Sequence, residues 1–336
     1  MAYEPQFVIR PAFLKLVEEI AALRERIQQA AVQLAWIPTV QKDSLSRNTH
    51  ASTAIEGNSL TLEQVRALGE GRAITATDER SRCEALNYFE ALRHIQKKSS
   101  KKKLRHEDIF RLHRILAAGV MDQGQPGRYR TMHVRVGDYI PPAPDDVSGL
   151  MFEFLEWWNT SSFELSPVIT AAVIHYRFEA IHPFADGNGR TGRALALWEL
   201  YRRGFDAHHI FSVDEFYWED RARYYRELTA VRHQGEDLSG WLEYFAEGLR
   251  GTLEKIWLRI QVVNPKSGGK LTIRPTQERL LRLLRDHGSM APAEIWVALK
   301  ISKQGAMDLI KPLMEAGLIE KNGGKKTGRY RLQSKL

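Results

Sequence analysis

The stretch FEAIHPFADGNGRTGRALALWEL, residues 178–200, holds the densest group of chemically active residues in the chain. Its central segment, HPFADGNGRTGR, places a histidine, an aspartate, an asparagine, three glycines and two arginines between two apolar, helix-like runs. Glycines leave backbone N–H groups open to a ligand, and a helix that begins there adds the positive end of its dipole. The segment therefore predicts an anion-binding turn between two helices.

The glycines and arginines of this segment suit a ligand rich in negative charge. Gly187, Gly189 and Gly192 remove the side chains that would keep a phosphate away from the backbone. Arg190 and Arg193 are three positions apart, so on a helix they share a face and can bind one polyphosphate together. A glycine-rich turn is weak evidence by itself, and the prediction depends on the arginines beside it.

The histidine and the aspartate indicate group transfer. Asp186 would repel a phosphate unless a cation lay between them, and Mg²⁺, which takes few protein ligands and several phosphate oxygens, meets that need. His182, as a neutral imidazole, could take a proton from an incoming hydroxyl. The chain lacks GxxxxGK[ST], which excludes a P-loop enzyme. We expect transfer from a magnesium nucleotide to a hydroxyl; the simpler alternative is that His182 only ends a helix.

The overall composition is that of a globular protein. Of 336 residues, 43% are hydrophobic and 27% are charged. The single cysteine, Cys83, excludes an internal disulfide and a cysteine metal cluster. The N-terminus lacks the pattern of a signal peptide, and no apolar run approaches the roughly 18 residues of a membrane helix. We therefore expect a cytoplasmic protein with no membrane partner.

The positive charge is concentrated at the C-terminal end. The chain carries a net charge of +8, yet residues 262–336 alone contain 15 Lys and Arg against 6 Asp and Glu. Only this part supports a nucleic-acid hypothesis. Three helical patterns followed by IEKNGGKKTGRYRL predict a winged helix-turn-helix domain over residues 273–336, with Gly323-Gly324 in the wing. Binding of DNA and contacts with protein both fit such a domain. The residues expected to contact DNA are Ser302, Lys303, Gln304, Lys325, Lys326, Arg329 and Arg331.

The remaining organisation is predominantly helical. We expect an N-terminal helical region over residues 1–78, a catalytic core over 79–261 and a linker over 262–272. Apolar residues at helical spacing predict a helix over 13–36, which either packs on its own core or forms a homodimer. One segment differs: in RYRTMHVRVGDYIPPAP, apolar and polar residues alternate, which predicts a short strand over 130–137.

HPFADGNGRTGR resembles the signature of the Fic (filamentation induced by cAMP) family, H-x-F-x-(D/E)-G-N-G-R-x-x-R, and matches every defined position. The surrounding chain, roughly residues 80–250, is also similar to the helical core of the family. The resemblance implies an all-α Fic-type core with a short β-hairpin flap, which the strand at 130–137 would form. It also implies transfer of AMP from ATP to a Ser, Thr or Tyr hydroxyl of a target protein, or of the protein itself (auto-AMPylation).

The resemblance also implies a role for each residue of the motif. His182 is the base that deprotonates the target hydroxyl, Phe184 anchors the loop in the core, and Asp186 holds Mg²⁺. The glycine amides and the asparagine cradle the phosphates, and the two arginines bind the outer ones. The residues implied to bind the nucleotide are Gly187, Asn188, Gly189, Arg190, Thr191, Gly192, Arg193, Tyr224 and Tyr225.

The sequence departs from the family pattern near the adenine side. Many members carry Asn-Arg-x-x-Tyr-Tyr downstream of the motif, whereas DRARYY places Asp220 in the asparagine position. Tyr224 and Tyr225 therefore stay candidates for the adenine pocket or for plain core positions.

A second motif, STAIEGN (residues 52–58), predicts regulation. Glu56 lies at an expected helix end, where the dipole disfavours negative charge and a nearby cation would help. The stretch resembles the inhibitory motif of the family, (S/T)-x-x-x-E-(G/N), with Ser52 and Glu56 in the defined positions. The resemblance implies that Glu56 pairs with Arg193 in the place of the γ-phosphate; the alternative is a surface glutamate that ends a helix.

Two other functions compete with this prediction. The same site can perform other nucleotide or phosphate transfers, or remove AMP, in which case Glu56 would orient a water molecule. A regulator that binds DNA through residues 273–336, with the Fic-like part as its sensor, belongs to a different class. Because the motif is intact, we expect an autoinhibited protein adenylyltransferase.

Overall fold

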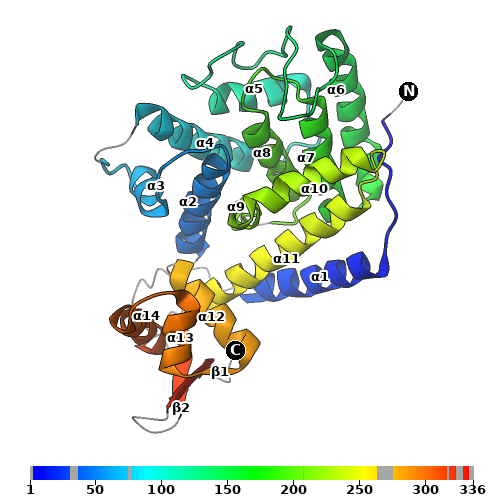
Figure 1. Cartoon of the computed structure of the whole chain (residues 1–336). Helices are drawn as coiled ribbons and strands as arrows, with labels where there is room; N and C mark the ends of the chain where they lie inside the picture. The colour runs from blue at the N-terminus through cyan, green and yellow to red at the C-terminus, as the bar shows by residue number, and fades with distance from the viewer. Residues whose placement is uncertain are drawn as a thin grey trace. The chain divides into compact units, whose positions relative to one another are not determined.

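The computed structural model of the chain describes residues 3–30, 37–74, 78–206, 208–262, 275–315, 318–322 and 328–332. They fall into two compact units, one of Met1–Ala22 with Gln41–Thr252 and the other of Leu23–Val40 with Leu253–Leu336. Figure 1 shows the elements of each. The expected linker lies almost wholly outside the described residues, and the expected domain boundaries stay a prediction.

The first unit is built from helices. Those with most of their residues in it are α1 (Pro11–Ala30), α2 (Ile37–Ile55), α3 (Leu62–Gly69), α4 (Glu79–Lys97), α5 (His106–Leu116), α6 (Pro144–Asn159), the 3₁₀ turn η1 (Ser161–Glu164), α7 (Pro167–Ile181), α8 (Asn188–Arg202), α9 (Asp214–Glu219), α10 (Arg221–His233) and α11 (Ser239–Val262). Among the described residues, no helix combines the length and the apolar character needed to cross a membrane.

Helices α7 and α8 form the centre of this unit and lie side by side (Figure 1). Ser166 begins α7, because its side chain accepts a hydrogen bond from the N–H of Val168 and Pro167 occupies the first turn. Nearly every residue of both helices is buried. Because both helices are buried on all sides, neither has a solvent-exposed face. The turn that joins α7 to α8 is therefore anchored in the core at both of its ends.

Helix α2 ends where the sequence predicts. The last helical residue is Ile55, and Gly57 follows with a φ of 97°. Only glycine adopts that backbone conformation without strain, so the chain turns away here and leaves Glu56 at the helix end.

The strand predicted over residues 130–137 is not formed. Only Val136 and Tyr139 exchange backbone hydrogen bonds, at 2.9 and 3.0 Å, which makes one tight turn. The alternating residues Met132 and Val136 are 41% and 38% exposed, so they find no core to pack against. The N–H of Arg130 donates instead to the carbonyl of Pro183. The backbone at Arg130 therefore contacts the motif loop and does not pair with a strand, although the alternating pattern of residues 130–137 predicts one.

In the part of the second unit that the structure describes, there are three further helices and a small sheet. They are α12 (Pro275–His287), β1 (Ser289–Met290), α13 (Pro292–Leu299), α14 (Lys303–Glu315), β2 (Ile319–Asn322) and β3 (Arg329–Leu332). The sheet is antiparallel in the order β1-β3-β2, with Lys321 opposite Tyr330. Leucines of α12 pack with Ile295 of α13 and Ile310 of α14 in one core. These elements lie where the sequence predicts helices and a hairpin; the winged-helix assignment itself stays a prediction.

Candidate active site

The backbone at His182 turns sharply to leave helix α7. His182 adopts a left-handed conformation, with a φ of 50° and a ψ of 59°, and its N–H donates to the carbonyl of Phe178. The buried guanidinium of Arg130 donates to the carbonyls that this turn leaves open, at 2.8 Å from that of His182 and 3.4 Å from that of Ile181. It also binds the carbonyl of Pro142 at 2.6 Å. Arg130 therefore fixes the conformation of the histidine turn.

Arg130→Lys should lower the free energy of unfolding by roughly 2 to 4 kcal/mol, because a lysine cannot satisfy these carbonyls together and leaves some of them buried without a donor. Denaturant unfolding measures the change. The exposed Arg128 supplies the matched control, since Arg128→Lys should cost about 0.5 kcal/mol or less. Equal losses in the two variants would contradict this role of Arg130.

The loop between α7 and α8 is anchored in the core by Phe184, which is fully buried. The ring of His113, from α5, stacks on it with ring centroids 3.6 Å apart. Nε2 of His113 lies 2.9 Å from the carbonyl of Asp186, and Nδ1 accepts a hydrogen bond from the N–H of Gly127. Burial lowers the pKa of His113 to about 4, so this histidine is neutral. Nothing in the sequence of α5 marks His113 as a partner of the loop, so its contact with Phe184 was not predicted.

Side chains of the motif hold the loop in a closed shape. Asn188 accepts from the N–H of Phe184 at 2.9 Å and donates to its carbonyl at 2.8 Å. Thr191 donates from its hydroxyl to the carbonyl of Gly187, which has a φ of 76°. The side chain of Asn188 is therefore bonded to the loop itself, while its main-chain N–H lies in the first turn of α8. That turn presents the open N–H groups of a helix start.

Arg193 is held by the end of helix α2. Its Nε donates to the hydroxyl of Ser52 at 2.8 Å, and one terminal nitrogen donates both to the carbonyl of Ser52 at 2.9 Å and to Oε1 of Glu56 at 2.7 Å. The guanidinium is almost completely buried, whereas the side chain of Glu56 is 32% exposed. Burial would raise the pKa of Glu56, but the charge and hydrogen bond of Arg193 and the charge of Arg190 outweigh it and lower that pKa. Glu56 is therefore ionised at neutral pH.

The contact between Glu56 and α8 depends on a glycine. A Cβ atom added at Gly189 would overlap Oε1 of Glu56 and lie 3.2 Å from a terminal nitrogen of Arg193. Glycine at this position lets the carboxylate approach the first turn of the helix. The Glu56 carboxylate thus lies at the place that the sequence analysis expects an anionic ligand to use.

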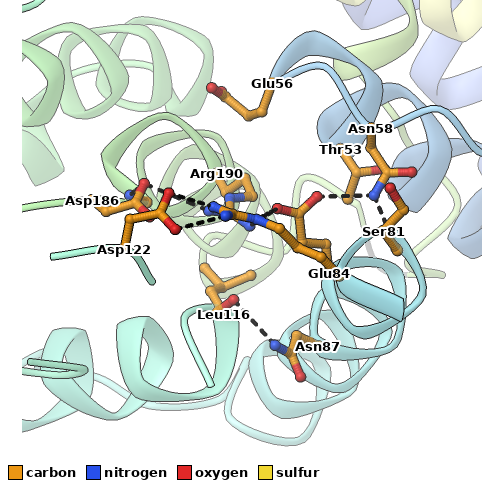
Figure 2. A network of polar contacts seen from close by, with 12 residues as sticks. Thr53, Glu56, Asn58, Ser81, Glu84, Asn87, Leu116, Asp122, Asp186 and Arg190 are labelled. Carbon is orange, nitrogen blue, oxygen red and sulfur yellow. Dashed lines mark hydrogen bonds and ion pairs between the residues drawn. The ribbon is translucent and has the colours of Figure 1, made fainter. Parts of the chain in front are cut away.

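Arg190, the other arginine of the motif, lies between Glu84 and Asp186 (Figure 2). Its nearest atoms are 3.5 Å from the Glu84 carboxylate and 3.8 Å from that of Asp186. Glu84 is itself fixed by Asn58, whose amide donates to it at 2.9 Å. Nε and one terminal nitrogen of Arg190 are buried without a hydrogen-bond acceptor among the described residues. The two carboxylates balance the charge of Arg190 without using all of its hydrogen-bond donors.

His182 lines a cavity of about 530 Å³ together with Arg193. The cavity is lined by Glu56, Val136, Gly137, Asp138, Tyr139, Glu179, His182, Gly189, Arg193, Tyr224, Tyr225, Leu228, Thr229, Arg232 and His233. Burial lowers the pKa of His182 to about 4, against the opposing effect of the Glu179 backbone. A neutral imidazole beside an anion-binding helix start can accept a proton from a bound hydroxyl.

The family model for the Fic/DOC family matches residues 103–200 of the chain, which include the motif, Arg130 and His113. Residues 103–200 form a Fic domain. The motif loop with its arginines and its histidine is thus the Fic loop of this domain, and the helical first unit has the all-α Fic fold.

Known proteins agree with this assignment. A protein adenylyltransferase Fic from Nematostella vectensis is 34% identical over 220 residues, which are 63% of this chain and 49% of that protein. One from Culex quinquefasciatus is 30% identical over 75% of this chain and 49% of its own length. The chain thus spans about half the length of these curated relatives. A Fic family protein from Desulfovibrio desulfuricans G20 shares the fold over 98% of both chains, with 27% identity and a TM-score of 0.67.

The two tyrosines beside the Fic loop occupy different environments. Tyr224 is buried, and its hydroxyl lies 3.0 Å from Nε2 of the buried His175, so its polar end belongs to the core. Tyr225 is 39% exposed and stays available to a flat ligand such as adenine. Asp220 caps α10 by accepting from the N–H of Arg223 at 2.9 Å. Aspartate and asparagine cap helices equally well. The start of α10 is therefore preserved although Asp220 replaces the asparagine of the family pattern.

Asp186 fits the needs of a magnesium ion. Its carboxylate accepts from the N–H of Gly187, and its side chain is 31% exposed. Among the described residues, no group of three or more His, Cys, Asp or Glu side chains could form a metal cage. Mg²⁺ usually keeps several waters and binds one or two carboxylates together with substrate phosphates. Asp186, a single carboxylate next to the anion-binding turn, matches that mode of Mg²⁺ binding.

The residues predicted to contact DNA lie in the second unit. Ser302, Lys303 and Gln304 are exposed at the start of α14. The exposed face of that helix also carries Asp308 and Glu315, which offset its lysines. Arg329 pairs with Glu294 at 2.7 Å and Arg331 with Glu320 at 2.6 Å; Lys325 and Lys326 lie outside the described residues. Four acidic groups beside these cations give no specific support for a DNA-binding face.

Proposed function

We propose that the chain transfers AMP from ATP to a Ser, Thr or Tyr hydroxyl of a target protein. The observation that carries the proposal is the juxtaposition of a neutral His182, the buried Arg193 and the first turn of α8 at Gly189 around one cavity. The names of the curated relatives support this reaction. A cavity of about 530 Å³ lies within the range of small-molecule sites.

In this reaction, the target oxygen attacks the α-phosphorus of ATP while the bond to pyrophosphate breaks. His182 takes the proton of the hydroxyl as that oxygen attacks. Arg193, the N–H groups of the first turn of α8 and Arg190 hold the phosphates and stabilise the charge that moves onto the leaving group. Bound Mg²⁺, held by Asp186, would add positive charge beside the phosphates.

Glu56 acts as the brake in this proposal. Its carboxylate bonds to Arg193, the cation that would otherwise bind the γ-phosphate, and two anions cannot share that donor. ATP can then bind only with its outer phosphate displaced, which moves the α-phosphorus away from His182. The residue is one third exposed at the cavity, so it can leave without unfolding the core.

The magnesium part of the proposal has its own test. Asp186→Asn should reduce AMP transfer about 100-fold or more at low Mg²⁺ and raise the Mg²⁺ concentration needed for half-maximal rate. The matched control is Asp122→Asn, because Asp122 is an exposed aspartate bonded to Arg80 rather than to the Fic loop. Rates at a series of Mg²⁺ concentrations, in a Glu56→Gly background, measure the effect. An unchanged Mg²⁺ dependence in Asp186→Asn would contradict the assignment.

A further inference from the structure

Glu179 is a buried carboxyl group in the last turn of α7, and neither the Fic signature nor the proposed reaction uses it. It is 8% exposed and lines the cavity beside His182. Its Oε1 has no hydrogen-bond donor among the described residues. A buried carboxyl without a donor costs free energy, so a purely structural role would be served better by an apolar residue of the same size.

The second oxygen of Glu179 faces the catalytic histidine. Oε2 lies 3.8 Å from Nδ1 of His182, a buried nitrogen that meets the geometric criteria for no hydrogen bond among the described residues, and the main-chain carbonyl of Glu179 also acts on the ring and raises its pKa. Because Nδ1 is closed off beside Glu179, the other ring nitrogen, Nε2, is the one left to meet a bound hydroxyl. The pair thus resembles sites in which the imidazole is the general base and a neighbouring carboxylate fixes its orientation.

Helix α8 leaves space for this carboxyl group. A Cβ atom added at Gly192 would lie 2.7 Å from Oε1 of Glu179 and 3.4 Å from the ring of Phe178. Gly192 has an ordinary helical conformation, in which glycine is a poor choice. Its lack of a side chain is explained by the room that the Glu179 carboxyl requires. The placement of Glu179 is therefore supported from both helices.

We propose that Glu179 is a positioning residue for His182: it keeps the proton of the neutral ring on Nδ1 and balances the charge of the imidazolium. This inference rests on the proposed AMP transfer. When Nε2 takes the proton of the target hydroxyl, the ring becomes positive while the Glu179 carboxylate beside Nδ1 stays negative. The Glu179 carboxylate thereby stabilises the positive charge that develops on His182 in the transition state.

The charges around Glu179 connect it to the brake. Burial raises the pKa of Glu179 to about 7; Arg193 on α8 and Arg232 on α10 lower it, and Glu56 at the end of α2 raises it. Loss of the Glu56 charge therefore lowers the pKa of Glu179 and leaves more of it ionised at neutral pH. Glu56 thus acts on the base as well as on Arg193.

The kinetic test compares Glu56→Gly with Glu56→Gly/Glu179→Gln across pH 5 to 9. In the parent, kcat for AMP transfer should rise with pH as Glu179 ionises, at a pH below 7 because Glu56 is absent. In the double variant, kcat should fall at least about tenfold and lose that rise, while KM for ATP stays within about twofold. An unchanged kcat and pH profile, or a raised KM with unchanged kcat, would overturn the proposal.

The matched control is Asp206→Asn in the same background. Asp206 is also buried with its pKa raised to about 7, but it accepts hydrogen bonds from the N–H groups of Ile210 and Phe211 and does not line the cavity. This variant should keep the pH profile of the parent. The same loss in both variants would mean that Glu179 only stabilises the fold, and would overturn the positioning role.

A second readout does not require activity. The ¹⁵N shifts of the His182 ring, assigned with His182→Ala, should report a protonated Nδ1 in the wild type and a mixture of both tautomers in Glu179→Gln. If Glu56→Gly transferred no AMP, the proposed reaction would fail while this measurement still tested the pairing. The same tautomer in both proteins would contradict the pairing itself.

Discussion

Glu56→Gly should increase AMP transfer about 10- to 100-fold over the wild type. The change removes one charge-assisted hydrogen bond to Arg193, and such a bond contributes roughly 1.5 to 3 kcal/mol. Because Ser52 still holds Arg193 through two hydrogen bonds, the guanidinium should keep its place and become available to the outer phosphate. Label from [α-³²P]ATP in the protein itself and in a cell lysate measures the effect.

The control for this variant is Glu70→Gly. Glu70 is a glutamate at the end of helix α3, bonded to Lys42 and Arg72, and it should have no influence on labelling. Glu56→Gln should be intermediate, since the amide oxygen can still accept from Arg193 without a charge. Equal transfer by the wild type and Glu56→Gly would contradict autoinhibition. Acid cannot replace the mutation in the neutral range, because the pKa of Glu56 is lowered.

His182→Ala in the Glu56→Gly background should reduce AMP transfer about 100- to 10,000-fold, the usual contribution of a general base. ATP should still bind, since the phosphate contacts assigned to Arg190, Arg193 and the first turn of α8 do not involve the ring. The low pKa of His182, which burial brings to about 4, means that the base is neutral from weakly acid pH upward.

Binding of ATP by calorimetry separates the loss of the base from damage to the site. We expect the dissociation constant of His182→Ala to stay within about threefold of the parent. A parallel loss of ATP binding would mean that the ring supports the nucleotide site. Residual transfer close to the parental rate would exclude His182 as the base.

The sequence could predict the Fic loop because its parts are contiguous. His182, Asp186 and Arg193 lie within one turn and the helix that follows, so local spacing alone brings them together. The ion pair between Glu56 and Arg193 spans 137 positions, and only the resemblance to a known family predicted it. The pair is present in the structure, and we propose that it is inhibitory.

Residues that support the loop from elsewhere in the chain were not predictable in the same way. Arg130 and His113 have ordinary sequence surroundings, and each contacts the loop only because the fold buries it there. The alternation around Val136 predicts a strand, yet a strand also needs a neighbour with open hydrogen-bonding groups. Here Arg130 takes the backbone contacts, and a single turn at Val136 and Tyr139 remains.

The most direct measurement compares label from [α-³²P]ATP and from [γ-³²P]ATP, with Mg²⁺, in Glu56→Gly and in Glu56→Gly/His182→Ala, with the mass of the adduct determined in parallel. The account predicts label from the α position only, an adduct with the mass of AMP, and the loss of both with His182→Ala. Label from the γ position, or no label in a variant that binds ATP, would contradict it.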